Sequence, residues 1–150
     1  MVVLNAGQLV TVSGQSGPRA GSAMRNLGII ENGYFAALDG VIVDVGPQCE
    51  FGRRVALDHG ATVVDAQGGV VSPGFVDPHT HLVFAGWRAA EFAMRIEGKT
   101  YLEIHRAGGG INSTVKSTRA ADEPLLLSSA IERLNECLRW GTTTVEVKSG

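Results

Sequence analysis

Residues 72–81 read SPGFVDPHTH, and the character of the chain changes there. Turn-forming residues open the stretch, and the apolar pair Phe75-Val76 that follows is typical of a short strand. The histidines His79 and His81 come directly after it. Side chains two positions apart on a strand point to the same face. The sequence therefore predicts a short strand that ends with two imidazoles on one side.

The segment beyond this motif alternates between helix and strand patterns. Thr100, with Glu103 three residues later, forms a capping-box pattern that predicts a helix over 101–107. Asp122 is the expected N-cap of a longer helix, and residues 111–115 and 142–147 are apolar or β-branched enough to suggest strands. The longer helix has one apolar stripe, formed by Leu127, Ile131, Leu134 and Leu138. This alternation is typical of the opening of a parallel α/β barrel or sheet.

Residues 1–71 have a different pattern, made of short apolar runs separated by turn residues. An Asp-Gly dipeptide joins the runs 34–38 and 41–45, which predicts a hairpin. The runs 62–64 and 70–71 flank a Gly-Gly dipeptide and suggest another strand pair. We therefore expect a small antiparallel β unit over this part of the chain.

Composition and charge exclude several classes of function. The 150 residues contain 13 Lys and Arg against 15 Asp and Glu, so no basic excess suits a nucleic-acid partner. No apolar run approaches the ~18 residues of a membrane helix, and the N-terminus lacks the features of a signal peptide. Cys49 and Cys137 are isolated, which is typical of reduced thiols in a cytoplasmic protein.

The length of the chain bears on the domain organisation. A (β/α)₈ barrel needs ~250 residues, whereas only about three strands are expected after residue 72. We therefore interpret residues 1–71 as a small β unit, and residues 72–150 as the first strands and helices of a barrel. On this interpretation the chain is an N-terminal portion of a larger α/β protein.

The two histidines are the strongest candidates for chemistry. Neutral imidazole is a good ligand for zinc or iron, and barrel enzymes keep their active sites at the C-terminal ends of their strands. An isolated His-x-His is more often a pair of surface histidines, but the preceding strand favours a metal site at His79 and His81. A catalytic metal needs about three protein ligands and an open position for water. The remaining ligands must therefore come from elsewhere.

The motif at 73–81 resembles the first-strand metal motif of the amidohydrolase superfamily. A departure is Pro78, which stands where a cysteine is common. Within the superfamily, the chain is most similar to the imidazolonepropionase family. The matching segments are residues 82–86, Arg88, 91–92, 100–104, 107–111, 113–115, 118–121 and 143–150.

The resemblance implies a fold and an activity. The family hydrolyses 4-imidazolone-5-propanoate to N-formimidoyl-L-glutamate, a step of histidine degradation. It uses one zinc or iron ion in a (β/α)₈ barrel that carries a small β-sandwich. The resemblance also suggests a homodimer. His79 and His81 correspond to two metal ligands, and Arg88 corresponds to the arginine that meets the substrate carboxylate. The family's other ligands, a histidine and an aspartate, lie on late barrel strands.

Two alternatives stay open at this stage. One is another amidohydrolase that deaminates a purine or a pyrimidine, although such a base lacks the carboxylate that Arg88 would pair with. The other is an inactive fragment that needs the rest of its chain, and we expect residues 1–150 alone to be inactive. Without the family resemblance, Arg88 would be interpreted as a solvated surface arginine.

Overall fold

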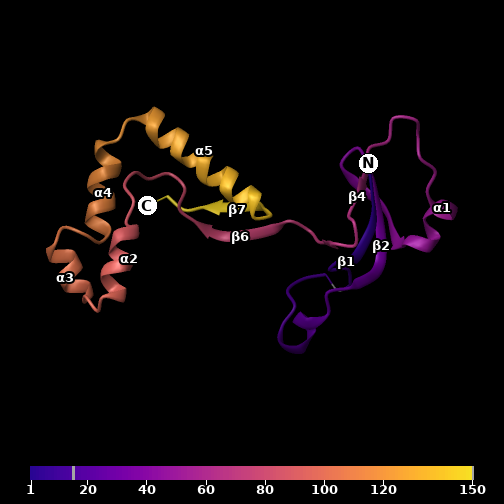
Figure 1. The fold of residues 1–150 in the computed structure, drawn as a ribbon, viewed down its shortest axis with the longest axis horizontal. Coiled ribbons are helices and arrows are strands. Elements are labelled where there is room, and N and C mark those ends of the chain that lie inside the picture. The colour runs from indigo at the N-terminus through magenta and orange to yellow at the C-terminus, as the bar shows by residue number, and fades with distance from the viewer. Residues whose placement is uncertain (15, 150) are drawn as a thin grey trace. The chain divides into compact units, whose positions relative to one another are not determined.

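The computed structural model describes residues 1–14 and 16–149. The chain forms two compact units, Met1–Pro73 and Gly74–Gly150 (Figure 1). Among the described residues, the first unit is a sheet with three short helical segments, and the second combines two strands with four helices. The fold class is therefore mixed α/β, as the sequence predicts.

The sheet of the first unit is built around β1 (Val2–Val10). On one side β1 pairs in antiparallel fashion with β2 (Ile29–Leu38), which in turn pairs with β3 (Val41–Pro47). On the other side β1 pairs with β4 (Val63–Asp65) and β5 (Val70–Val71), and both of these pairings are parallel. The short helical segments are η1 (Gly21–Arg25), η2 (Gln48–Glu50) and α1 (Phe51–Arg54).

The predicted hairpin is confirmed, but the expectation of a purely antiparallel unit is wrong. Segments β4 and β5 do not pair with each other, because β1 supplies their hydrogen bonds instead. The Asp65 carboxylate accepts hydrogen bonds from the Asn5 side chain at 3.0 Å and from the Gln67 backbone N–H at 2.9 Å. Gly68, with φ of 77°, completes the turn, and the Gly7 N–H donates to Gly69 at 2.9 Å. These contacts hold the turn against β1.

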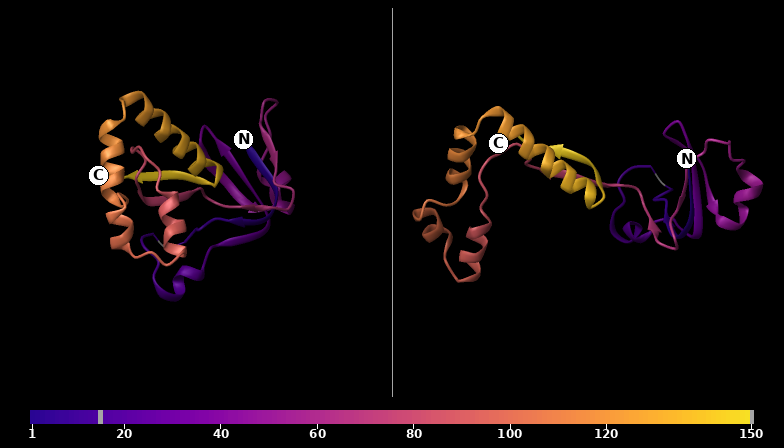
Figure 2. Two further views of the ribbon diagram at one scale, coloured as in Figure 1. Left: turned by 60° about the vertical axis from the view of Figure 1, so that its left-hand side comes forward. Right: turned by 45° about the horizontal axis from the view of Figure 1, so that its top comes forward.

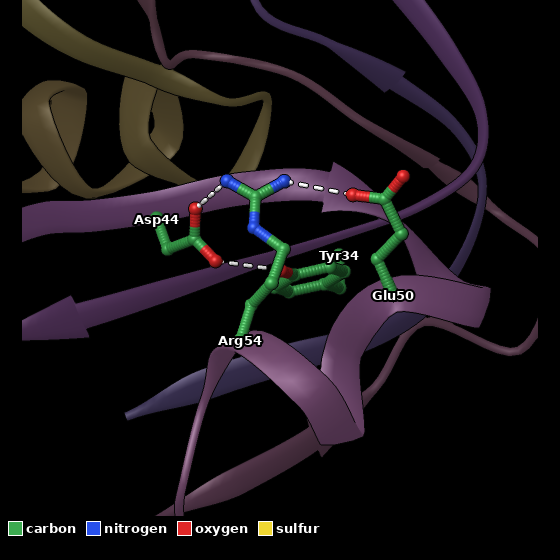
Figure 3. A network of polar contacts seen from close by, with 4 residues as sticks. All are labelled: Tyr34, Asp44, Glu50 and Arg54. Carbon is green, nitrogen blue, oxygen red and sulfur yellow. Dashed lines mark hydrogen bonds and ion pairs between the residues drawn. The ribbon is translucent and has the colours of Figure 1, made fainter.

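Tyr34 lies at the centre of the first unit, fully buried. Its ring meets Phe51 edge-on at a centroid distance of 5.1 Å, and its hydroxyl donates to Asp44 at 2.6 Å (Figure 3). The guanidinium of Arg54 bridges Asp44 and Glu50, the latter at 3.0 Å. Burial, followed by the hydrogen bond to Asp44, raises the pKa of Tyr34. The buried hydroxyl is therefore satisfied and stays protonated at neutral pH.

In the second unit, β6 (Phe75–Thr80) pairs in parallel with β7 (Thr142–Val147). The connection between them contains α2 (Ala89–Ile96), α3 (Tyr101–Arg106), α4 (Ile111–Ala120) and α5 (Glu123–Arg139). Helix α5 runs alongside β7 in each view (Figures 1 and 2). Within the described residues, no helix combines the length and the hydropathy needed to cross a bilayer.

Local signals predicted α3 and α5 correctly. The Thr100 side chain accepts from the Glu103 N–H at 3.3 Å, and the Glu103 carboxylate accepts from the Thr100 N–H at 2.7 Å. Asp122 caps α5 through the Leu125 N–H at 2.9 Å. The strand predicted over 111–115 is wrong, because those residues begin α4 directly after Gly110. That glycine has φ of 77°, which turns the chain into the helix.

Candidate functional site

The two candidate ligands lie at the end of β6. His79 is in the strand and His81 follows its last residue, and the centroids of the two rings are 5.4 Å apart. A ring nitrogen binds zinc at about 2.0–2.1 Å, so two imidazoles that share one ion keep their centroids within about 6.5 Å. The observed separation meets this requirement, and both side chains are exposed. Among the described residues, no group of three or more histidine, cysteine or acidic side chains surrounds a single point.

Strand β7 fixes the end of β6. The Lys148 N–H donates to the Thr80 carbonyl at 2.8 Å, and the Thr80 hydroxyl donates to the Glu146 carbonyl at 2.9 Å. The Asp77 carboxylate accepts from the His79 N–H at 3.1 Å, so it shapes the chain at the histidines. Parallel pairing therefore brings Lys148 beside the end of β6, close to His81.

A pocket of about 730 Å³ opens where β6 ends. Its lining includes the candidate ligand His81 and the candidate substrate residue Arg88, whereas His79 lies outside the lining. The remaining lining residues are Val83, Phe84, Gly86, Trp87, Ala89, Ile111, Thr114, Val115, Thr118, Arg119 and Lys148. The fold thus brings two of the three residues singled out by the sequence to one cavity of a size that suits a small molecule.

The charge of this lining is positive. The side chains of Arg88, Arg119 and Lys148 are positively charged, and no acidic residue lines the pocket within the described part of the chain. The Lys148 ammonium contacts the Glu146 carboxylate, which partly offsets one of these charges. Guanidinium groups bind carboxylates with two parallel hydrogen bonds. The arrangement can therefore attract and orient an anionic group.

Arg88 is tethered but still accessible. It is the N-cap residue of α2, and its side chain is 41% exposed. Its Nη1 lies 3.5 Å from the Glu91 carboxylate, whose other oxygen accepts from the Gly110 N–H at 2.8 Å. Glu91 thus links the guanidinium to the start of α4. The weak contact at 3.5 Å leaves the other nitrogens of the guanidinium available to a ligand.

The loop between the two candidate residues is anchored to neighbouring helices. Leu82 is buried, and the Thr118 hydroxyl accepts from the Ala85 N–H at 3.1 Å. Arg133 of α5 donates to the carbonyls of Leu82 and Phe84. Sequence reasoning missed these anchors because each joins positions more than 30 residues apart. Glu91 could have been found, because it lies three positions after Arg88 on a helix, where opposite charges meet.

Part of the chain matches a known protein family. Residues 62–123 match the amidohydrolase family, and this segment includes β6, both histidines, Arg88 and helices α2 to α4. The resemblance to amidohydrolases stated from the motif at 73–81 is therefore confirmed.

Relatives that match along nearly the whole chain have a more specific name than the family. The chain is 51% identical over 150 residues to an imidazolonepropionase of Symbiobacterium thermophilum, covering 100% of this chain and 35% of that protein. It is 52% identical over 148 residues to one of Solibacter usitatus, covering 99% and 35%. It is 50% identical over 152 residues to one of Geobacillus kaustophilus, covering 100% and 36%. The chain spans about a third of the length of these relatives.

Proposed function

We propose that the full-length protein hydrolyses 4-imidazolone-5-propanoate to N-formimidoyl-L-glutamate, as a step of histidine degradation. The observation that carries this proposal is the position of His81 and Arg88 on one pocket of about 730 Å³. The relatives named imidazolonepropionase, about half of whose aligned residues are identical, support the same activity.

Each candidate residue has a defined task in this reaction. Arg88 binds the propionate carboxylate of the substrate, because its planar guanidinium matches a carboxylate in geometry and charge. His79 and His81 hold one zinc or iron ion, and other residues of the full-length protein supply the remaining ligands. When bound, such an ion lowers the pKa of a water molecule from ~15.7 toward ~7 and polarises a carbonyl. Phe84 and Val115 give the pocket apolar surface beside these polar groups.

We infer that the second unit is the start of a (β/α)₈ barrel and that the first is part of a small β-sandwich. The domain boundaries on this interpretation are 1–71 and 72–150. Two parallel strands joined through helices, with β6 and β7 side by side, support the barrel interpretation. The homodimer that the family resemblance suggests and the cytoplasmic location expected from the sequence stay predictions.

The proposal is tested with the purified full-length protein and the candidate substrate. We expect loss of imidazolone absorbance with formation of N-formimidoyl-L-glutamate, abolition by a chelator and recovery with zinc or iron. Residues 1–150 expressed alone are expected to show no turnover, because they hold only two of the ligands that a catalytic metal needs. Deamination of a purine or pyrimidine without turnover of the imidazolone would contradict the proposed substrate.

A further inference from the structure

The loop of residues 82–88 joins the candidate ligand His81 to the candidate substrate residue Arg88. Its position therefore sets the distance between the two groups. One side chain from a distant helix contacts the backbone of this loop twice. Arg133 of α5 donates from Nη1 to the Leu82 carbonyl at 2.6 Å and to the Phe84 carbonyl at 3.1 Å.

The same guanidinium also stacks on an aromatic ring. The Cζ atom of Arg133 lies 3.7 Å from the centre of the Phe84 ring, which places the cation over the ring. The Phe84 ring is in turn stacked with Trp87, with centroids 6.5 Å apart and planes inclined by 10°. Arg133, Phe84 and Trp87 thus form a chain of contacts that ends at the residue before Arg88.

Arginine is suited to this task for a chemical reason. Its guanidinium is always charged, so both hydrogen bonds to the carbonyls are charge-assisted, and its flat face can cover a ring at the same time. Lysine has a single ammonium group and no flat face. A lysine at position 133 would therefore keep part of the attraction to the carbonyls and lose the stacking on Phe84.

We propose that Arg133 is a positioning residue that holds loop 82–88 so that Arg88 reaches the substrate carboxylate. The inference rests on the proposed function in one respect, which is the role of Arg88. Nothing in the geometry gives Arg133 a contact with substrate, because it is absent from the residues described as lining the pocket. Its effect on the reaction passes through the loop.

The kinetic test uses Arg133→Met, Arg133→Lys and the control Arg139→Met in the full-length protein. Arg139 lies on the same helix, but its side chain is 78% exposed and forms its ion pair with Glu136 of the same helix. We expect Arg133→Met to raise KM about tenfold with a smaller change in kcat, since it removes two charge-assisted hydrogen bonds. Arg133→Lys is expected to fall between Arg133→Met and the unchanged control.

A double-mutant cycle shows whether the effect passes through Arg88. If it does, Arg133→Met has little further effect on kcat/KM in a protein that already carries Arg88→Ala, so the two changes are not additive. Fully additive effects would overturn the proposal. Equal KM values for Arg133→Met and the wild type would overturn it too.

A readout without activity monitors the loop itself. In a full-length protein whose other tryptophans are replaced by phenylalanine, the fluorescence anisotropy of Trp87 reports how firmly the loop is held. Anisotropy suits this position because Trp87 is already 76% exposed. We expect Arg133→Met to lower the anisotropy of Trp87 and Arg139→Met to leave it unchanged. Unchanged anisotropy in Arg133→Met would refute the action of Arg133 on the loop. Lowered anisotropy, combined with no effect of Arg88→Ala on turnover, would instead refute the substrate role of Arg88 and with it the route through that residue.

Discussion

The first unit buries apolar side chains around β1, whereas the second unit leaves most of its apolar residues exposed. Val2, Val3, Leu9 and Tyr34 are buried in the first unit. In the described part of the second unit, the buried apolar side chains are only Leu82, Ile104 and Ala130. Phe75 and Val76 of β6, by contrast, are more than 60% exposed.

On the proposed barrel, the exposed apolar faces of the second unit are surfaces for the rest of the full-length protein. At its pocket, the second unit has specific polar contacts. Arg133, Thr118 and Glu91 each fix backbone near the candidate site through hydrogen bonds. The two units are therefore expected to respond differently to substitution. Substitutions in the core of the first unit should act on stability, whereas substitutions around the pocket should act on ligand binding.

The largest expected effect is in the first unit. Tyr34→Ala removes a fully buried ring and leaves Asp44 without its hydroxyl partner. We expect the free energy of unfolding to fall by about 3–5 kcal/mol, measured by urea denaturation of the full-length protein. Tyr34→Phe serves as the matched control, because it keeps the ring and should cost only about 1 kcal/mol. A loss of activity in the folded Tyr34→Phe protein would contradict the expectation that the first unit acts on stability alone.

A smaller effect, this time on function, is expected at Arg88. Arg88→Ala should lower kcat/KM by a factor that corresponds to about 1.5–3 kcal/mol of lost transition-state stabilisation, because a charge-assisted pair with the substrate carboxylate is lost. Steady-state kinetics measure this change. Arg95→Ala is the control, since Arg95 lies in the last turn of the same helix and is exposed. Metal content and unfolding midpoint should stay normal in both variants, and an unchanged kcat/KM would rule out the role.

The smallest expected effect concerns the N-terminus of α3. Hydrogen bonds from the Thr100 backbone and then from its hydroxyl lower the pKa of Glu103 below its ordinary value of 4.5. A lowered pKa in the folded state means that this contribution to stability is complete above pH 4.5 and is lost as the pH falls through the lower folded value. Glu103→Gln should flatten the acid part of the stability profile. An identical profile in wild type and variant would show that the capping box does not contribute.

The sequence predicted an element correctly where the contacts that define it join residues close together in the chain. The capping residues Thr100 and Asp122 contact backbone three positions away, so their patterns were sufficient to predict the starts of α3 and α5. Asn32-Gly33 has the composition of a hairpin turn, yet it lies inside β2 because that segment pairs with β1. Parallel pairing of β4 and β5 with β1 joins residues about 60 apart, which no turn rule detects.

The error at residues 111–115 has a different cause. Ile111, Thr114 and Val115 favour a strand by composition, but together with Thr118 they follow helical spacing and line one pocket. That spacing was visible in the sequence and was outweighed by β-branching. At the candidate site, the His79–His81 pair and Arg88 could be proposed from motif and resemblance. Arg133 could not, because its partner Leu82 lies 51 positions away.

The central claim is that His79 and His81 hold a metal ion in the second unit, and metal analysis tests it most directly. Full-length wild type, His79→Ala, His81→Ala and the control His59→Ala would be purified side by side, and zinc and iron counted per chain. His59 is exposed in the first unit, away from the motif. We predict about one ion per chain in the wild type and the control, and a strong loss in both motif variants, because each removes one of the few ligands. Wild-type metal content in His79→Ala and His81→Ala would contradict the account.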